Sequence, residues 1–155
     1  MNTSLQCRTM RRQGGSVVVE AAIVLPLLLL LVLATAEFGR ALLHYNTLQK
    51  TVRDATRYVA ENAINRNTKL IDLTPTLIAT TRNLAAYGSP SAGTALLPGL
   101  APANVTVTSP DAFHVRVSAT YTYRPIFATI PTFGLGSGNI SVPTTLTSAQ
   151  TMRAL

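Results

Sequence analysis

A glycine pair, a serine and one glutamate near the N-terminus have the residue types and spacing for chemistry. Gly15 is followed by Ser16, and Glu20 is the only charged residue in the apolar run from Ser16 to Ala36. A glycine leaves the backbone without a side chain, so a protease site can accept it readily. Cutting after Gly15 would make Ser16 a new cationic α-amine. Glu20 would then be a carboxylate that pairs with this amine or with that of a neighbouring subunit.

The remaining reactive side chains do not form a recognisable catalytic or metal-binding pattern. The chain has two histidines, His44 and His114, and a single cysteine, Cys7. The six acidic residues show no catalytic pairing, and the serines lack a GxSxG elbow. The sequence therefore predicts no enzyme activity, no metal and no cofactor.

Composition narrows the function classes further. The formal net charge is +7, and the charged share is only 12%, about half of the usual share for a soluble domain. The basic residues are scattered, whereas nucleic-acid binding favours a clustered basic face. One cysteine cannot form an internal disulfide, so the fold must rest on its apolar core. We expect no nucleic-acid partner.

The apolar run must position Glu20, and three interpretations of it remain open. Its 21 residues would span roughly 30 Å as a helix, enough for a bilayer core. It is either an uncleaved anchor, a secretory signal cut after Ala36, or the retained helix of a chain cut after Gly15. Pro26 inside it predicts a kink, because its ring removes one helical hydrogen bond. Arginines before the run favour a cytoplasmic N-terminus; they are Arg8, Arg11 and Arg12.

Beyond the run, the periodicity favours continuation of the same helix from Ser16 to about Asn62. The apolar side chains follow heptad spacing; they are Phe38, Ala41, Tyr45, Leu48, Val52, Ala55 and Val59. We expect the C-terminal half of this seam to pack on the protein's own domain. A cut after Ala36 would fall where the seam begins, which argues mildly against the secretory signal.

The rest of the chain predicts a second helix and a small sheet. Thr74-Pro75 is a good helix start, and Gly88 is a plausible stop, so we expect a helix over 75–87 with Leu77, Ile78, Leu84 and Ala85 on one face. Period-two alternation predicts strands at 105–107, at 113–123 and, as an edge containing Pro143, at 140–146, with loops at 88–102 and 124–139. The predicted fold class is α+β: a long N-terminal helix, its first half membrane-spanning and its second half amphipathic, packed on about three antiparallel strands.

The motifs resemble a known family. Gly15 before Ser16 and Glu20 is similar to the class III signal of type IV pilins. The stretch from Val17 to Ala60 resembles TadE-like proteins, which are minor pilins or pseudopilins of the tight-adherence (Flp-type) pilus. The matching motifs are Val19-Glu20, Leu25-Pro26, Glu37-Phe38-Gly39-Arg40 and Ala55-Thr56-Arg57-Tyr58. Ala21 departs from the family, which often has Phe there, and this leaves the glycine and the glutamate in place.

The resemblance implies a role in building adhesive pili. It implies a leader over 1–15 that a prepilin peptidase removes, a transmembrane pilin helix over 16–36 and an extracytoplasmic α+β domain over 37–155. The implied partners are the prepilin peptidase, the major Flp pilin, other minor pilins, the inner-membrane assembly platform and membrane lipid. The implied location is the bacterial inner membrane, single-pass with a periplasmic C-terminal domain, with possible incorporation into an extracellular pilus. The alternative from another class is a secreted soluble binding protein released by cleavage after Ala36.

Overall fold

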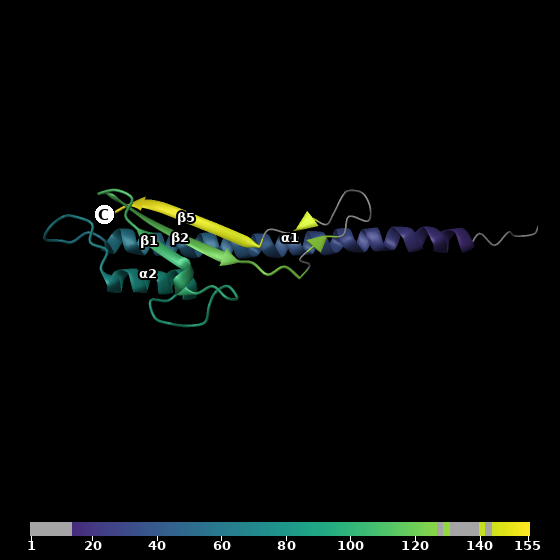
Figure 1. Cartoon of the computed structure of the whole chain (residues 1–155), viewed down its shortest axis with the longest axis horizontal. Coiled ribbons are helices and arrows are strands. Elements are labelled where there is room, and N and C mark those ends of the chain that lie inside the picture. Colours follow the sequence, from purple (N-terminus) through teal and green to yellow (C-terminus); the bar gives the residue numbers. More distant parts are fainter. Residues whose placement is uncertain (1–13, 127–128, 131–139, 142–143) are drawn as a thin grey trace, which may run out of the picture. The chain divides into compact units, whose positions relative to one another are not determined.

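The computed structural model describes residues 14–126, 129–130, 140–141 and 144–155. The chain divides into two compact units, Met1–Ala36 and Glu37–Leu155. The helix α1 (Gly14–Asn62) contributes to both, and the second unit adds the helix α2 (Pro75–Tyr87) and a three-stranded antiparallel sheet (Figure 1). The predicted α+β class is confirmed. Residues 1–13, which hold Cys7, the three arginines and most of the predicted leader, lie outside the described residues.

In the first unit, α1 is apolar and long enough to cross a bilayer, and none of that stretch is buried within the chain. Pro26 lies inside the helix, which continues past it. The Thr35 hydroxyl is satisfied within the helix, because its Oγ1 donates a hydrogen bond to the carbonyl of Leu31 over 2.6 Å. The described part of this unit therefore offers no core of its own to bury the apolar side chains.

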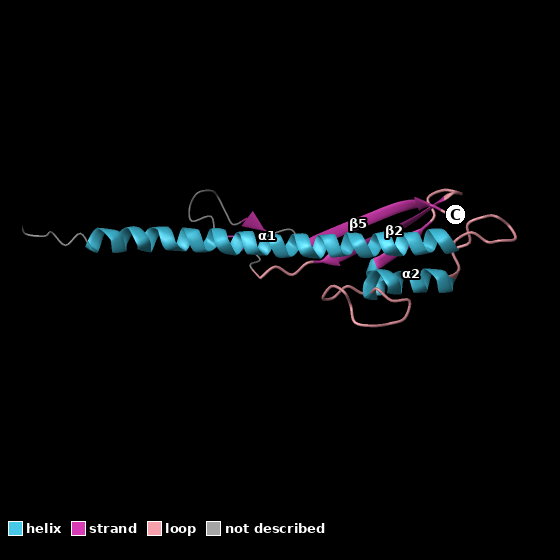
Figure 2. Ribbon diagram, turned by 180° about the vertical axis from the view of Figure 1, so that it is seen from behind, coloured by secondary structure: helices cyan, strands magenta, loops and turns pink. Residues whose placement is uncertain are grey.

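The sheet of the second unit has the order β1-β2-β5. Its strands are β1 (Val105–Thr108), β2 (His114–Thr122) and β5 (Thr145–Arg153). Val107 pairs with Val117, and Val117 pairs with Gln150 on the other side. A separate two-stranded ladder joins β3 (Thr129–Ile130) to β4 (Ile140–Ser141). Figure 2 shows β2 and β5 drawn beside α1.

Two predictions about these strands were wrong in detail. The third strand of the sheet runs over Thr145–Arg153 rather than 140–146, and Ile140 pairs with Ile130 instead. The inward positions of β5 include Ser148 and Gln150, whose polarity hides the period-two signal. The segment expected to be a loop at 124–139 contains β3, while Pro143 lies outside the described residues.

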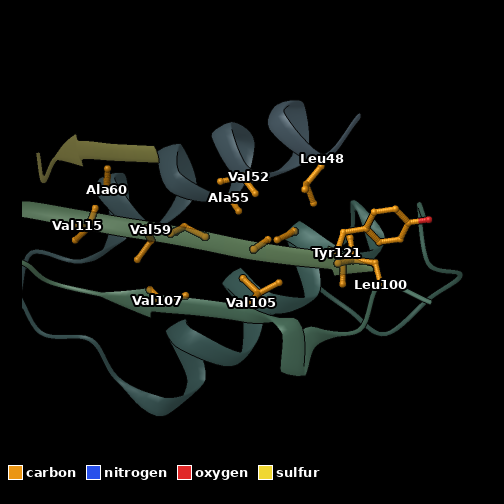
Figure 3. Packing of buried hydrophobic residues seen from close by; sticks show 14 of the residues in the cluster. Leu48, Val52, Ala55, Val59, Ala60, Leu100, Val105, Val107, Val115 and Tyr121 are labelled. Carbon is orange, nitrogen blue, oxygen red and sulfur yellow. The ribbon is translucent and has the colours of Figure 1, made fainter. Parts of the chain in front are cut away.

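One core unites α1, α2 and the inner face of the sheet (Figure 3). Leu48, Val52, Ala55 and Val59 are each 0% exposed, which confirms that the C-terminal half of the seam packs on its own domain. Their strand partners are buried at alternate positions, as expected for a sheet with one covered face; they include Val105, Val107, Val115, Val117, Ala119 and Tyr121.

The ends of the predicted apolar patterns do not join the core. Phe38 opens the seam and is 65% exposed, and Phe113, predicted to point inward, is 64% exposed. Phe113 precedes β2 in a turn where the carboxylate of Asp111 accepts hydrogen bonds from the amides of Phe113 and His114, both at 2.8 Å. Phe113 therefore belongs to the turn rather than to the strand, and the alternation of exposed and buried side chains begins only at His114.

The helix α2 begins and ends where the sequence predicts. The Thr74 hydroxyl accepts a hydrogen bond from the amide of Leu77, Pro75 occupies the first turn, and Gly88 closes the helix with φ 71°. Ala85 is buried as expected, and Thr81 and Ala86 join it. The Thr81 hydroxyl donates to the carbonyl of Leu77 over 2.7 Å, which satisfies it inside the core. A 3-10 helix, η1 (Pro102–Asn104), then leads into β1.

Candidate functional site

The N-terminal residues singled out in the sequence lie on the first turns of α1. Gly15 and Ser16 are helical in backbone, and a Cβ added at Gly15 would have no neighbour within 4 Å. Glu20 lies one turn further on with an exposed side chain. Within the described part of the chain, no ion pair reaches Glu20. Any cation that neutralises it must therefore come from outside the described ranges or from another molecule.

Glu37 and Arg40 are brought together at the start of the second unit. An Nη atom of Arg40 donates to Oε1 of Glu37 over 2.8 Å. The side chain of Glu37 is only 12% exposed and that of Arg40 is 37% exposed. Because the Glu37 carboxylate is shielded from water, its remaining lone pairs need hydrogen-bond partners within the protein.

Those partners come from the chain that leaves β2. The hydroxyl of Tyr123 donates to Oε1 of Glu37 over 2.6 Å, and the amide of Ile126 donates to the same oxygen over 3.1 Å. Arg40 donates from Nε to the Tyr123 hydroxyl over 3.0 Å and from Nη2 to the carbonyl of Arg124 over 2.9 Å. Its guanidinium carbon also lies 5.1 Å from the centre of the Tyr123 ring, within range of a cation–π interaction.

The network holds Glu37 in its charged form. Burial alone would raise the pKa of this carboxyl, but hydrogen bonds from Tyr123, Arg40 and the Ile126 amide together hold its pKa below the ordinary 4.5. The pKa of Tyr123 is raised above its ordinary 10.0 by burial and by its hydrogen bond to Glu37. Tyr123 therefore stays a donor, Glu37 stays an acceptor, and the link is charge-assisted.

The two central residues of the same motif point away from this network. Phe38 is exposed, and a Cβ added at Gly39 would meet nothing within 4 Å. Glycine in a helix interior costs about 1 kcal/mol relative to alanine. No contact within the described chain offsets that cost, so Phe38 and Gly39 have no packing role in this chain that the structure explains.

A second polar contact lies one turn further along α1. Nδ1 of His44 is 3.0 Å from the hydroxyl of Tyr121, and its ring meets the Tyr123 ring edge-on at 5.3 Å between centroids. Tyr121 lies in β2 and Tyr123 just after it, so the two side chains are two residues apart and share the inner face. Both of their hydroxyls reach α1. This contact gives His44 a structural partner. In the described residues, no group of three His, Cys, Asp or Glu side chains could hold a metal.

The sequence missed Tyr123 as a member of this site. The parity of the strand placed Tyr121 and Tyr123 on the inward face, and a buried tyrosine hydroxyl usually finds a hydrogen-bond partner. That rule could have pointed to a polar group on α1. It could not have named Glu37 and Arg40, since the pairing of β2 with the helix is set only by the fold.

An apolar helix long enough to cross a membrane, followed by a small α+β unit, fits the class of single-pass membrane proteins. Residues 15–57 match the family model described as TadE-like protein, which confirms the resemblance seen in the motifs. The match spans α1 from Gly15 through the Glu37–Arg40 network to Arg57. This family connects the chain to the Tad (Flp) pilus system. No curated protein and no solved structure gives a match to the chain.

Proposed function

We propose that this chain is a minor pilin, or pseudopilin, that takes part in assembling adhesive Flp/Tad pili. A prepilin peptidase cuts it after Gly15, and the helix from Ser16 stays in the inner membrane with its N-terminus on the cytoplasmic side. The domain from Glu37 onward faces the periplasm. Its partners are then the major Flp pilin, other minor pilins and the inner-membrane assembly platform.

The observation that carries this proposal is where the family match begins. It starts at Gly15 and runs through the apolar stretch into the second unit, so the apolar segment is part of the family's shared region. The helix α1 also continues without a break past Ala34-Thr35-Ala36. Signal peptidase sites need an accessible small-residue segment, and a continuous helix supports retention of the segment instead.

In this proposal the cut creates the charge that Glu20 needs. Cleavage leaves an α-amine on Ser16, and the carboxylate of Glu20 follows within about one helical turn. An unpaired carboxylate in a low-dielectric environment costs several kcal/mol. A subunit is therefore most stable where Glu20 meets an amine, which sets the axial position of one subunit against the next.

One observation favours the alternative, a secreted binding protein released by cleavage after Ala36. The second compact unit begins at Glu37, the residue that would become its N-terminus. Glu37 and Arg40 would then lie in the first turn of a helix, where fraying weakens side-chain contacts. The Tyr123 network needs Glu37 and Arg40 held in a stable helical turn, which argues against Glu37 as a free N-terminus.

The N-terminus of the mature chain distinguishes the possibilities. N-terminal sequencing and intact mass of the protein from membranes should give Ser16 as the first residue. Glu37 first would support secretion, and retained Met1 would support a simple anchor. Gly15→Leu should accumulate the uncleaved form, whereas Gly14→Ala, the other member of the glycine pair, should be processed normally. Equal processing of both variants would contradict a cut at Gly15.

A further inference from the structure

Four exposed apolar side chains lie just beyond the apolar segment, three on α1 and one on the loop that follows β2. We call them the juxtamembrane residues: Phe38, Leu42, Leu43 and Ile126, which are 65%, 44%, 67% and 69% exposed. Single exposed apolar residues are common in proteins. Three within six consecutive helical residues, joined by a fourth from a loop, need a more specific explanation.

The fold adds Ile126 to this set. Its amide donates to Oε1 of Glu37 over 3.1 Å, so the Ile126 backbone lies against the first turn of the second unit. The sequence alone places Ile126 far from Phe38. The Glu37 network thus brings an exposed loop residue to the same level of the helix as Phe38.

The directions of these side chains indicate what covers them. With about 100° per residue, Phe38, Leu42 and Leu43 point about 100°, 140° and 240° around the helix from Glu37. Ile126 lies on the Glu37 side itself. A partner helix would contact one stripe of α1, whereas these residues surround it. A lipid environment contacts a helix from every open side.

Chain connectivity gives the depth. If Ser16–Ala36 fills the hydrocarbon core, Phe38 lies about 3 Å and Leu43 about 10 Å past its edge. The headgroup region on one side of a bilayer is roughly 5–8 Å thick, so the backbone of Phe38 lies within it and that of Leu43 at its outer boundary. Helical side chains tilt toward the N-terminus of their helix, which directs the Leu43 side chain back toward the acyl chains. The charges nearby are also compatible with lipid headgroups. Arg40 neutralises Glu37, and the exposed Arg124 adds a cation that suits lipid phosphate.

We propose that the juxtamembrane residues insert into the outer leaflet interface of the inner membrane, so that the second unit rests on lipid through Phe38, Leu42, Leu43 and Ile126. This inference rests on the membrane anchoring in the proposed function. It adds a defined lipid-contact surface on the domain itself, whose position is fixed by the Glu37–Tyr123 network.

The chain contains no tryptophan, so single-tryptophan variants report each position without background. The full-length chain is reconstituted in phosphatidylcholine–phosphatidylglycerol vesicles whose acyl chains are brominated near the headgroup. Reporters are Phe38→Trp and Leu43→Trp. Leu28→Trp lies near the middle of the apolar segment, so it is the insertion control in matching vesicles whose acyl chains are brominated near their ends. Leu70→Trp replaces a leucine that is 61% exposed and follows the far end of α1, so it is the control for aqueous exposure.

Phe38→Trp and Leu43→Trp should lose emission in brominated vesicles, with a blue shift relative to Leu70→Trp, and the loss should persist when the protein is diluted in lipid. Quenching no greater than that of Leu70→Trp would overturn the proposal. Quenching that appears only on dilution would also overturn it, because a second copy would then cover these residues. Unquenched Leu28→Trp would instead refute the anchoring in the proposed function. Since all four positions are exposed, the substitutions leave the core intact.

Discussion

The hydroxyl of Tyr123 donates a hydrogen bond to Oε1 of Glu37 over 2.6 Å, across 86 positions of sequence. Glu37 opens the second compact unit, and Tyr123 follows the last residue of β2. The bond therefore fixes the end of the central strand to the first helical turn of the domain. It also gives Glu37 and Arg40, which lie within the stretch matched by the TadE-like family model, a role inside the chain.

Replacing Tyr123 by Phe should destabilise the second unit by about 1–3 kcal/mol, because a shielded carboxylate loses a charge-assisted donor and Arg40 loses an acceptor. Tyr121→Phe is the matched control, since that hydroxyl contacts the imidazole of His44 and should cost only about 0.5–1.5 kcal/mol. Urea unfolding of the detergent-solubilised chain, followed by near-UV circular dichroism, measures both. A loss for Tyr121→Phe as large as that for Tyr123→Phe would contradict the special role of Glu37.

Acid should weaken the same link. The pKa of Glu37 in the folded chain is below the ordinary 4.5, since hydrogen bonds from Tyr123, Arg40 and Ile126 outweigh the opposing effect of burial. A lowered folded-state pKa gives stability that is complete above the unfolded pKa and is lost as the pH falls through the folded pKa. The melting temperature should therefore fall as the pH decreases below about 4.5.

Glu37→Gln should flatten this part of the pH profile while lowering stability at neutral pH. Asp111 also has a lowered pKa, chiefly from the Phe113 amide and the His114 ring, so Asp111→Asn is the control for acid sensitivity elsewhere. An unchanged acid limb in Glu37→Gln would show that another carboxyl is responsible.

The helical parts of the fold could be predicted because their signals are local. Thr74, Pro75 and Gly88 define α2 through cap chemistry that depends only on nearby residues. The seam from Leu48 to Val59 repeats often enough to reveal its buried face. β5 could not be placed this way, because its inward Ser148 and Gln150 break the apolar alternation, and its pairing with β2 is a long-range contact.

Alanine substitutions should distinguish a buried leucine of the seam from an exposed leucine outside it on the same helix. Leu48 is 0% exposed, so Leu48→Ala should cost about 2–5 kcal/mol through lost burial and a residual cavity. Leu43 lies on the same helix and is 67% exposed, so Leu43→Ala should change stability in detergent by less than about 0.5 kcal/mol. Chemical unfolding of both variants tests this, and comparable losses would place Leu43 in the core.

The two helix-associated glycines should respond to alanine in opposite directions. Gly88 has φ 71°, and an added Cβ would lie 3.1 Å from Cδ1 of Leu96, so Gly88→Ala should destabilise the domain by about 1 kcal/mol or more. Gly39 is helical with open space around it, so Gly39→Ala should stabilise the isolated chain by up to about 1 kcal/mol. Thermal unfolding distinguishes them. A destabilising Gly39→Ala would reveal a contact within the chain that the structure does not contain.

The candidate site was only half predictable. Glu37, Phe38, Gly39 and Arg40 form a continuous motif and could be named from the sequence. Only the fold shows that Glu37 and Arg40 bind Tyr123 while Phe38 and Gly39 face away from it, because no local pattern indicates that Tyr123 reaches Glu37. Gly15, Ser16 and Glu20 carry chemistry that depends on a cut and on a neighbouring molecule, so their roles remain predictions.

The Glu20 prediction concerns assembly rather than folding. Glu20→Ala removes a carboxylate that is exposed on α1. The variant should therefore insert into the membrane and be cut to Ser16 like the wild type. It should nevertheless be depleted from the sheared pilus fraction and co-purify less with the major pilin, because no carboxylate then favours the position where an amine is available. Glu61→Ala is the matched control: it removes an exposed glutamate of the same helix whose partner is Arg57 at 2.9 Å, and surface pairs contribute little. Normal co-purification of Glu20→Ala, with Ser16 still as its first residue, would leave the amine pairing without support.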